Sequence, residues 1–441
     1  MTNDRPQPGY KQTEVGVIPE DWEVKRLKQI SPSQSVGLVI NPSSYFDNEG
    51  SVPMLVGSQI SENHINWEVA NRISSVSNEL LPASRLAAGD LVTVRVGNPG
   101  VTAVVTPELD RCNCASMMIV RQHSSFSSLW LCYVMNSRIG RSQIEHVQYG
   151  TAQKQFNISD AIDFIYPVPP LPEQRSISQA LSDVDALIAS LDKAIDKKRA
   201  IKTATMQQLL TGKKRLPGFG EGKGDRQTEV GVIPEDWDVS LLSELTSELG
   251  DGIHATPIYS NGEYYFVNGN NLFNGRITIS LDTRKVGILE FRKYRKNLSN
   301  RSILMSINGT IGNLAYYRDE PIILGKSAAY LNIKKEFSKR FIYFSLQTES
   351  VEQFFRDGLT GTTIRNLGLV TIRNTPISIP RQYEEQRAIA TVLSDIDAEI
   401  AALETRLAKT RSIKQGMMQQ LLTGKVRLKI EAGMDAGRED D

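Results

Sequence analysis

The sequence predicts an α+β protein in which two tandem β-rich domains are separated by two long antiparallel helices, paired as a coiled coil about a pseudo-twofold axis. Three observations support this fold class. A long helical stretch near the middle of the chain recurs at its end, and a shorter segment recurs at the start of each half. The regions between these repeats contain many short β-branched runs. A repeat of this length indicates duplicated domains, because solenoid repeats are much shorter.

The first long helix is predicted over residues 172–215. Its apolar residues alternate at spacings of four and three, which is the seam of a coiled coil. Pro172 suits the first helical position, and Gly212 suits the left-handed position just after a helix. At 1.5 Å per residue, the helix is expected to be roughly 60 Å long. The seam residues are Ile177, Leu181, Val184, Ile188, Leu191 and Ile195.

The second long helix is predicted over residues 381–428. Its sequence repeats the first, since Glu173-Gln174-Arg175 recurs 212 residues later as Glu385-Gln386-Arg387. Two helices with the same seam can bury their apolar stripes against each other. The alternative is that each helix packs separately on its own domain. The seam residues of this copy are Ile389, Leu393, Ile396, Ile400, Leu403 and Leu407.

The remaining boundaries follow from a second repeat. The segment Gln12–Val24 (QTEVGVIPEDWEV) recurs as Gln227–Val239 (QTEVGVIPEDWDV) and marks the start of each half. We therefore expect a first domain over residues 1–171, a glycine-rich linker over 216–226 and a second domain over 227–380. Residues 429–441 are expected to form a disordered tail.

Composition excludes several classes of protein. The 441 residues carry a net charge of +1, and no apolar run approaches the 18 residues that a membrane-spanning helix needs. We expect a cytoplasmic protein that does not associate with a membrane. The three cysteines, Cys112, Cys114 and Cys132, do not suggest a disulfide framework or a complete metal site. No catalytic constellation is recognisable, so we expect neither a catalytic nor a metal-binding residue.

One stretch is strongly basic. Residues 284–301 (RKVGILEFRKYRKNLSNR) contain seven lysines and arginines, a single acid and two interleaved aromatic residues. This pattern suits contact with the phosphates of a nucleic acid. The alternative is a solvated basic face with no ligand. The proposed contact residues are Arg292, Lys293, Arg295 and Lys296.

Two polar loops occupy equivalent positions in the two halves, at Gly150–Asn157 and Gly361–Asn366. Their side chains have donors suited to base edges or phosphates. The alternative is that each loop only closes its domain. Other basic residues of the first half, including Arg95 and Arg121, are scattered and give a weaker signal. The candidate DNA-binding residues outside the basic stretch are Arg95, Gln153, Lys154, Asn157, Arg365 and Asn366.

The repeated motifs resemble those of the specificity subunit of type I restriction–modification systems. The matching pieces are VGVIPEDW at Val15–Trp22 and Val230–Trp237, the EQR segments at the helix starts, and QQLLTGK at Gln207–Lys213 and Gln419–Lys425. The resemblance covers nearly the whole chain. The second copy departs from it at Arg381-Gln382-Tyr383, where no proline precedes the glutamate.

This resemblance implies a non-catalytic DNA-recognition subunit. Each target-recognition domain would read one half of a bipartite sequence in double-stranded DNA, and the helices would set the spacer. Two methyltransferase subunits would dock on the helices and the adjacent surfaces, and restriction/translocase subunits would join them. The chain itself would carry no cofactor, because S-adenosylmethionine, ATP and Mg would belong to the partner subunits.

Two other functional classes remain possible from the sequence. One is a coiled-coil adaptor that presents two protein-binding domains. The other is a self-contained DNA methyltransferase, although the sequence has no recognisable cofactor motif.

Overall fold

The computed structural model describes residues 6–151, 153–361 and 365–428. The predicted tail, 429–441, lies outside the described residues. The chain forms two compact units, and the boundary between them crosses both long helices. Unit 1 contains Met1–Asp192 and Thr405–Asp441, whereas unit 2 contains Lys193–Glu404. Each unit therefore combines one β-rich domain with part of both long helices.

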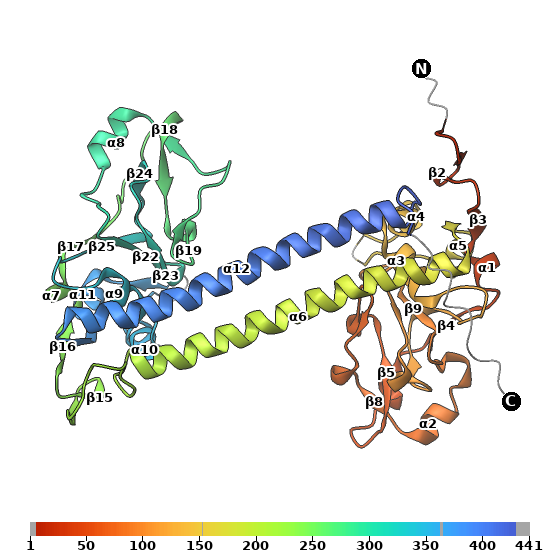
Figure 1. Ribbon diagram of the computed structural model, residues 1–441, viewed down its shortest axis with the longest axis horizontal. Coiled ribbons are helices and arrows are strands. Elements are labelled where there is room, and N and C mark those ends of the chain that lie inside the picture. The colour runs from red at the N-terminus through yellow and green to blue at the C-terminus, as the bar shows by residue number, and fades with distance from the viewer. Residues whose placement is uncertain (1–5, 152, 362–364, 429–441) are drawn as a thin grey trace. The chain divides into compact units, whose positions relative to one another are not determined.

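The two long helices are α6 (Leu171–Leu209) and α12 (Tyr383–Leu421), each of 39 residues (Figure 1). In unit 1 the start of α6 lies beside the end of α12, where Lys414 pairs with Asp185 at 2.5 Å. In unit 2 the end of α6 lies beside the start of α12, where Lys202 pairs with Asp397 at 2.7 Å. These are two copies of one ion pair, and they confirm that the helices pack antiparallel.

Both long helices end earlier in the chain than the sequence predicts. They stop at Leu209 and Leu421, before the expected ends at 215 and 428. Gly212 and Gly424 follow with φ of +73° and +70°, a conformation that breaks a helix. A Cβ at Gly212 would lie 2.5 Å from the ring of Pro234, so the chain also needs glycine for this close approach. At the other end, α12 begins at Tyr383 instead of at 381.

Unit 1 builds its β-rich domain from small sheets. The largest has the order β10-β9-β12-β4 with antiparallel pairing throughout, and a three-stranded sheet has the order β11-β5-β8. The strands are β1 (Tyr10–Thr13), β2 (Gly16–Pro19), β3 (Glu23–Arg26), β4 (Gln34–Val36), β5 (Val52–Leu55), β6 (Ile60–Ser61), β7 (His64–Ile65), β8 (Arg72–Ile73), β9 (Leu91–Val94), β10 (Thr102–Val104), β11 (Asn113–Cys114), β12 (Met117–Val120) and β13 (Ile165–Val168). The short helices are α1 (Leu27–Ile30), α2 (Ser75–Glu79), α3 (Ser128–Asn136), α4 (Arg138–Val147) and α5 (Ile158–Ala161).

The core of unit 1 joins the domain to both long helices. Trp22, Trp130 and Phe156 are fully buried in it. Ile177 and Leu181 enter the same core from α6, and Leu421 and Leu422 enter it from α12 and the residue that follows. The first domain is therefore completed by residues from the far end of the chain.

Unit 2 repeats this plan with longer strands. Its largest sheet has the order β17-β25-β22-β27-β26, and β23 also pairs with β22. The strands are β14 (Asp225–Thr228), β15 (Gly231–Pro234), β16 (Trp237–Leu241), β17 (Thr246–Asp251), β18 (Tyr259–Val267), β19 (Leu272–Phe273), β20 (Arg276–Ile277), β21 (Lys285–Val286), β22 (Ser302–Asn308), β23 (Thr310–Tyr316), β24 (Ile322–Leu324), β25 (Ala328–Ile333), β26 (Leu359–Thr360), β27 (Asn366–Leu367) and β28 (Pro376–Pro380). The short helices are α7 (Leu242–Leu245), α8 (Ile288–Tyr294), α9 (Lys339–Ser345), α10 (Glu349–Asp357) and α11 (Leu369–Arg373).

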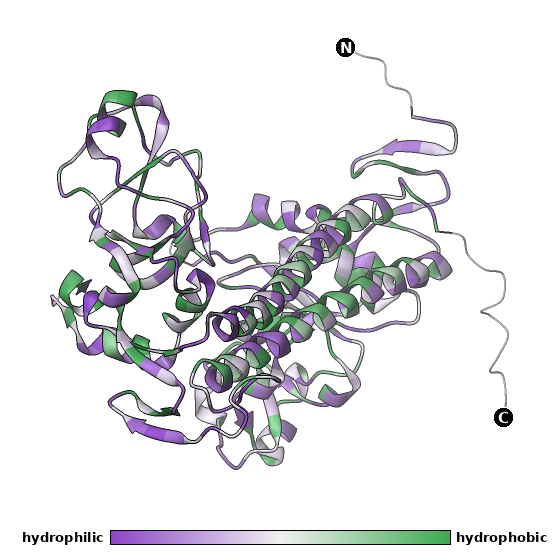
Figure 2. Ribbon diagram, turned by 60° about the vertical axis from the view of Figure 1, so that its left-hand side comes forward, coloured by the Kyte–Doolittle hydropathy of each residue, from purple (hydrophilic) through white to green (hydrophobic). Residues whose placement is uncertain are grey.

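The core of unit 2 is assembled in the same way. Trp237 and Phe341 are fully buried and meet edge to face, with ring centroids 6.2 Å apart. Met206 and Leu209 reach this core from α6, while Ile389 and Leu393 reach it from α12. Figure 2 shows apolar and polar residues recurring along both long helices, as expected for helices that bury one stripe only.

Candidate nucleic-acid interface

In unit 1 the predicted loop lies against the turn between β9 and β10. The N–H of Gly97 donates to the carbonyl of Lys154 at 2.9 Å, and Val96 pairs with Gln155. Gly97 has φ of +92°, so the turn favours glycine at this position. The loop is therefore anchored by its backbone, and the side chain of Lys154 is exposed.

Unit 2 has the same arrangement at the turn between β22 and β23. The N–H of Gly309 donates to the carbonyl of Arg365 at 3.2 Å, and Asn308 pairs with Asn366. Gly309 has φ of +75°. The side chain of Arg365 is exposed, as that of Lys154 is in unit 1. Each unit thus presents one exposed cation beside a glycine turn, at equivalent positions of two different sequences.

Neither of these cations is neutralised by the rest of the described chain. Lys154 and Arg365 make no ion pair with a described residue. An exposed, unpaired cation whose own backbone is fixed by a hydrogen bond is well suited to contact a phosphate or a base edge.

The other loop candidates differ in how free they are. The side chain of Gln153 is exposed, and that of Asn366 is half-buried. Asn157 is partly committed, because its Oδ1 accepts a hydrogen bond from the hydroxyl of Tyr149 at 2.9 Å. Arg95 is half-buried beside the loop, where its carbonyl accepts from the N–H of Phe156 at 3.3 Å.

A polar cleft of about 450 Å³ adjoins the turn of unit 1. Arg141 braces one wall, donating to the carbonyl of Pro99 at 2.8 Å and to Oδ1 of Asn98 at 3.1 Å. Sequence reasoning missed Asn98, Glu145 and Gln148, which line the cleft together with Lys154. These residues are recognised as one site only in the folded chain, where the turn between β9 and β10 lies beside α4.

The basic stretch forms α8 and the segment after it. Arg292, Lys293 and Arg295 are exposed, and Lys296 is half-buried. The helix is fixed to the domain by Phe291, whose ring stacks on that of Tyr264 at a centroid distance of 3.9 Å. None of the four cations forms an ion pair within the described part of the chain. The stretch is therefore an ordered, uncompensated basic surface.

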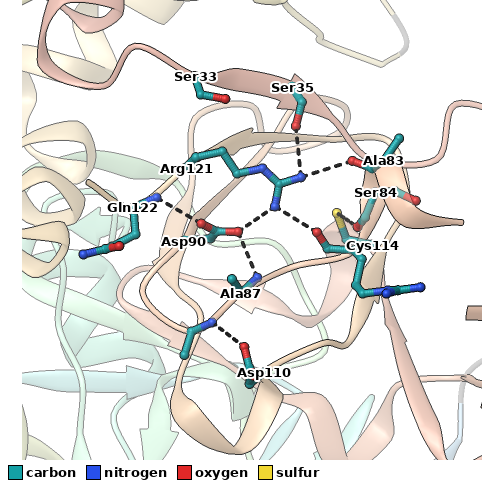
Figure 3. Close-up of polar contacts among 12 residues, drawn as sticks. Ser33, Ser35, Ala83, Ser84, Ala87, Asp90, Asp110, Cys114, Arg121 and Gln122 are labelled. Carbon is teal, nitrogen blue, oxygen red and sulfur yellow. Dashed lines mark hydrogen bonds and ion pairs between the residues drawn. The ribbon is translucent and has the colours of Figure 1, made fainter. Parts of the chain in front are cut away.

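One scattered arginine is committed to the fold of unit 1. Arg121 pairs with the buried Asp90 at 2.7 Å and also donates to the carbonyls of Arg85 and Ala83 (Figure 3). Asp90 in turn accepts from the backbone N–H of Gln122 at 3.0 Å. These contacts fix the end of β12 to the start of β9, so the guanidinium of Arg121 is committed to the fold.

The predicted seam residues are all removed from solvent to some degree. Eight are buried and four are half-buried. The buried residues are Ile177, Leu181, Leu191, Ile195, Ile389, Leu393, Ile400 and Leu407. The half-buried residues are Val184, Ile188, Ile396 and Leu403. They occupy the predicted stripe, and ion pairs such as Asp192–Arg411 in unit 1 and Arg199–Glu404 in unit 2 flank it.

Each unit also contains an arginine clamp that the sequence did not reveal. In unit 1, Arg427 makes two hydrogen bonds to Glu173, at 2.6 and 2.7 Å, and two to Asp21, at 2.9 and 2.8 Å. Trp22 donates its indole N–H to Glu173 at 3.0 Å. Hydrogen bonding from Arg427 holds the pKa of Asp21 below its usual value of 3.8. The clamp joins the start of the domain, the start of α6 and the segment after α12.

Unit 2 has the equivalent clamp at Arg215. This side chain makes two hydrogen bonds to Glu385, at 2.6 and 2.7 Å, and two to Asp236, at 2.8 and 2.9 Å. The guanidinium lies 5.7 Å from the ring of Trp237. Hydrogen bonding from Arg215 likewise lowers the pKa of Asp236. The two clamps hold the domains on the helix ends and leave the loops at the glycine turns free.

Three further features of the described residues bear on function. Within the described ranges, no group of three or more His, Cys, Asp and Glu residues is arranged to hold a metal ion. Burial raises the pKa of the Cys112 thiol to about 12, which makes it a poor nucleophile. None of the helices in the described ranges has the length and apolar character that a membrane crossing requires.

Two β-rich domains share a pair of long helices, and each exposes a cation at a glycine turn, which gives a two-module protein suited to bind a nucleic acid. The chain belongs to the family described as the type I restriction modification DNA specificity domain, which it matches twice, over residues 19–198 and 234–411. It is therefore a DNA specificity subunit of a type I restriction–modification system, a non-catalytic subunit that carries no cofactor itself.

Known proteins agree with this membership. The chain is 26% identical over 438 residues to the type I restriction enzyme MjaVIII specificity subunit of Methanocaldococcus jannaschii, covering 93% of this chain and 94% of the relative. Its fold resembles the crystal structure of the S subunit from M. genitalium, with a TM-score of 0.56 and 14% identity over 91% of this chain and 96% of the other. A chain from a study of complex assembly and conformational transition of the type I R-M system matches with a TM-score of 0.52 and 17% identity, over 93% and 99% of the two chains.

Proposed function

We propose that each β-rich domain reads one half of a bipartite sequence in double-stranded DNA. The observation that carries the proposal is the pair of equivalent loops, in which Lys154 and Arg365 project beside Gly97 and Gly309. The scaffold is duplicated, but the side chains on it differ between the units. Two readers with different target sequences require that combination.

We further propose that four residues of the basic stretch hold DNA backbone beside the half-site of unit 2. Their side chains are ordered on α8 or just after it, and they meet no acid that neutralises them. Contacts of this kind strengthen binding to all sequences alike. These residues are Arg292, Lys293, Arg295 and Lys296.

The long helices are proposed to set the spacer between the half-sites. Each has 39 residues, or about 58 Å at 1.5 Å per residue. The seam residues and the ion pairs beside them stiffen the pair, and the arginine clamps fix each domain to the helix ends. A rigid connection of fixed length is what a ruler between two readers needs.

Two methyltransferase subunits are proposed to dock on the helices and the adjacent surfaces. Each unit exposes one isoleucine at the same helix position, Ile201 with 40% and Ile413 with 48% of its surface accessible. Exposed apolar side chains on a helix are typical of a partner surface. Two equivalent sites suit two copies of one partner. Restriction/translocase subunits would then join this core, with the whole complex acting on DNA in the cytoplasm.

The test is an exchange of one reader. Residues 25–165 are replaced by the same region of a relative that methylates a different motif, and the chain is expressed with its partners. Genome-wide detection of methylated adenine should show that one half-site has changed while the other half and the spacer remain. A change in both halves would contradict separate readers.

A further inference from the structure

Four cations meet at one corner of unit 2, and three of its segments supply them. Arg301 directly precedes β22, Arg318 follows β23, and Lys339 and Arg340 begin α9. The charges of Arg301, Arg340 and Arg318 all act on the ammonium group of Lys339, and Asp319 opposes them. None of the four cations forms an ion pair with any residue that the structure describes. The corner is therefore a cluster of four cations, which the charge of Asp319 opposes without forming an ion pair.

Two of these side chains are held in place by backbone carbonyls. Lys339 donates to the carbonyl of Asn300, and its Nζ lies 4.9 Å from the ring centroid of Tyr316. Arg301 donates to the carbonyls of Ile333 and Phe337, at 3.2 and 2.5 Å, and also to that of Lys334. Arg318 and Arg340 are exposed, so they form the solvent-facing side of the cluster, whereas Lys339 and Arg301 are fixed by their hydrogen bonds.

The surroundings of Lys339 disfavour its charged form. Burial, followed by the charges of Arg301, Arg340 and Arg318, lowers the pKa of Lys339 to about 8. Like charges at such close quarters repel one another, and a bound anion would reverse that effect. The groups that face Lys339 are Arg301 from the start of β22, Tyr316, Arg318 and Asp319 from the end of β23, and Arg340 on α9 itself.

The equivalent corner of unit 1 is neutral, which provides an internal comparison. There Asp90 precedes β9 and pairs with Arg121, which follows β12 (Figure 3). In unit 2, Arg301 precedes β22, and its guanidinium contacts the carbonyl of Lys334, which follows β25. The contact between the start of one strand and the end of its neighbour is thus an ion pair in unit 1 and involves an unpaired cation in unit 2. The fold therefore does not require a positive cluster at this position.

The cluster continues the basic stretch along β25. Lys296 lies 6.0 Å from the ring centroid of Tyr330, and the carbonyl of Asn297 accepts from Nδ2 of Asn332 at 2.8 Å. Arg301 then contacts the carbonyls of residues 333 and 334. Residues 330 and 334 are about 13 Å apart at the rise of a strand. A polyanion that follows the basic stretch would therefore reach the cluster.

We propose that Arg301, Arg318, Lys339 and Arg340 form a phosphate-binding site that holds the DNA backbone against unit 2. The inference rests on the proposed function and extends it, because it assigns a backbone contact beyond the four contact residues proposed in the basic stretch and beyond the reading loops. A DNA phosphodiester is favoured as the ligand over a carboxylate of a protein partner, because the four cations extend the basic surface of α8 and the segment after it. The site contributes affinity and register, and it carries no base information.

The test measures salt and pH dependence of binding by the full chain with its methyltransferase partners. The probe is a fluorescent random-sequence duplex, and the readout is anisotropy. Lys339→Gln and Arg318→Gln should each lower the slope of log K against log salt by about 0.9 and weaken binding to all sequences alike. Arg318 is exposed, and its side chain makes no hydrogen bond to a residue of the described ranges, so its replacement should leave the fold intact. The matched control is Lys335→Gln, which removes an exposed cation from the same segment.

Proton linkage gives a second readout. A pKa of about 8 means that wild-type binding should weaken by up to about tenfold between pH 7 and pH 9, as Lys339 loses its proton. Lys339→Arg should keep the salt slope and lose most of this pH dependence, because arginine stays protonated. The proposal would be contradicted if binding by Lys339→Arg kept the pH dependence of the wild type and both Gln variants kept the wild-type salt slope.

The outcome is separable from that of the proposed function. If Arg365→Gln lowers the salt slope and the cluster variants do not, DNA reading stands and the phosphate site falls. If none of these variants changes binding, both the phosphate site and the reading loop of unit 2 fail, and the basic stretch is left as the proposed DNA contact of that unit. Loss of methyltransferase assembly in Arg318→Gln, with DNA binding unchanged, would assign the cluster to a protein partner and contradict the proposal.

Discussion

The arginine clamp of unit 1 gives a prediction whose size follows from its geometry. Arg427→Gln removes the guanidinium that makes four hydrogen bonds to Glu173 and Asp21. The side chain of Glu173 is only 1% exposed, and its remaining side-chain donor is the indole of Trp22. The substitution therefore leaves a buried carboxylate without its counter-charge.

The expected loss is about 3 kcal/mol of unfolding free energy, the lower end of the range for breaking a buried ion pair. The lower end applies because 38% of the Arg427 side chain is exposed, so water can partly replace it. The contact with the more exposed Asp21 adds no more than about 1 kcal/mol. For a unit of this size, the midpoint of thermal unfolding should fall by roughly 6 to 12 °C.

The assay is differential scanning calorimetry of the full chain. Lys425→Gln, which replaces an exposed cation two residues earlier, serves as the control and should shift the midpoint by less than about 2 °C. Combining Arg427→Gln with Glu173→Gln should recover at least half of the loss, because the uncompensated charge is then gone. A midpoint within 2 °C of wild type for Arg427→Gln alone would refute this reasoning.

Three further outcomes are expected. Lys154→Gln or Arg365→Gln should each reduce the salt slope of DNA binding by about 0.9, and unchanged slopes in filter-binding titrations would speak against both loops. Ile201→Asp combined with Ile413→Asp should abolish co-purification of methyltransferase subunits without lowering the thermal midpoint; full recovery of the complex would remove these positions from the docking surface. The lowered pKa of Asp21 contributes stability above pH 3.8 that is lost as pH falls through the lowered value, so urea unfolding in acid should be less pH-dependent in Arg427→Gln than in wild type.

Repetition made the helices and the loops predictable from the sequence. The seam at Ile177 and its copy at Ile389 signalled two helices of one length, and the structure confirms their antiparallel packing. Gly150 and Gly361 marked equivalent loops, and both have positive φ. In each case the information is local or is a comparison of two stretches, which a sequence displays directly.

Features that combine distant segments were not predictable. Arg215 and Arg427 stand in repeated motifs, but the buried glutamates that they bind lie 170 and 254 residues away. The phosphate cluster draws its four cations from three segments, and only Arg301 belongs to the basic stretch, so that stretch alone does not reveal it. Conversely, Arg121 looked like a candidate for binding because its partner Asp90 is 31 residues away and joins it only through the sheet. Basic residues in a sequence indicate a binding surface only if they do not form ion pairs within the fold.

The measurement that tests the central claim most directly is a lengthening of the ruler. Four residues are added after Ile188 and four after Ile400, which extends each helix by roughly 6 Å and shifts the seam little in phase. The pairs Asp185–Lys414 in unit 1 and Lys202–Asp397 in unit 2 lie outside the insertions and should persist.

The methylated motif of the lengthened protein, expressed with its partners, is then read genome-wide. DNA advances about 3.4 Å per base pair along each strand, so the spacer should grow by one or two base pairs while both half-sites stay the same. An active complex that kept the original spacer would contradict the claim that the helices measure the target.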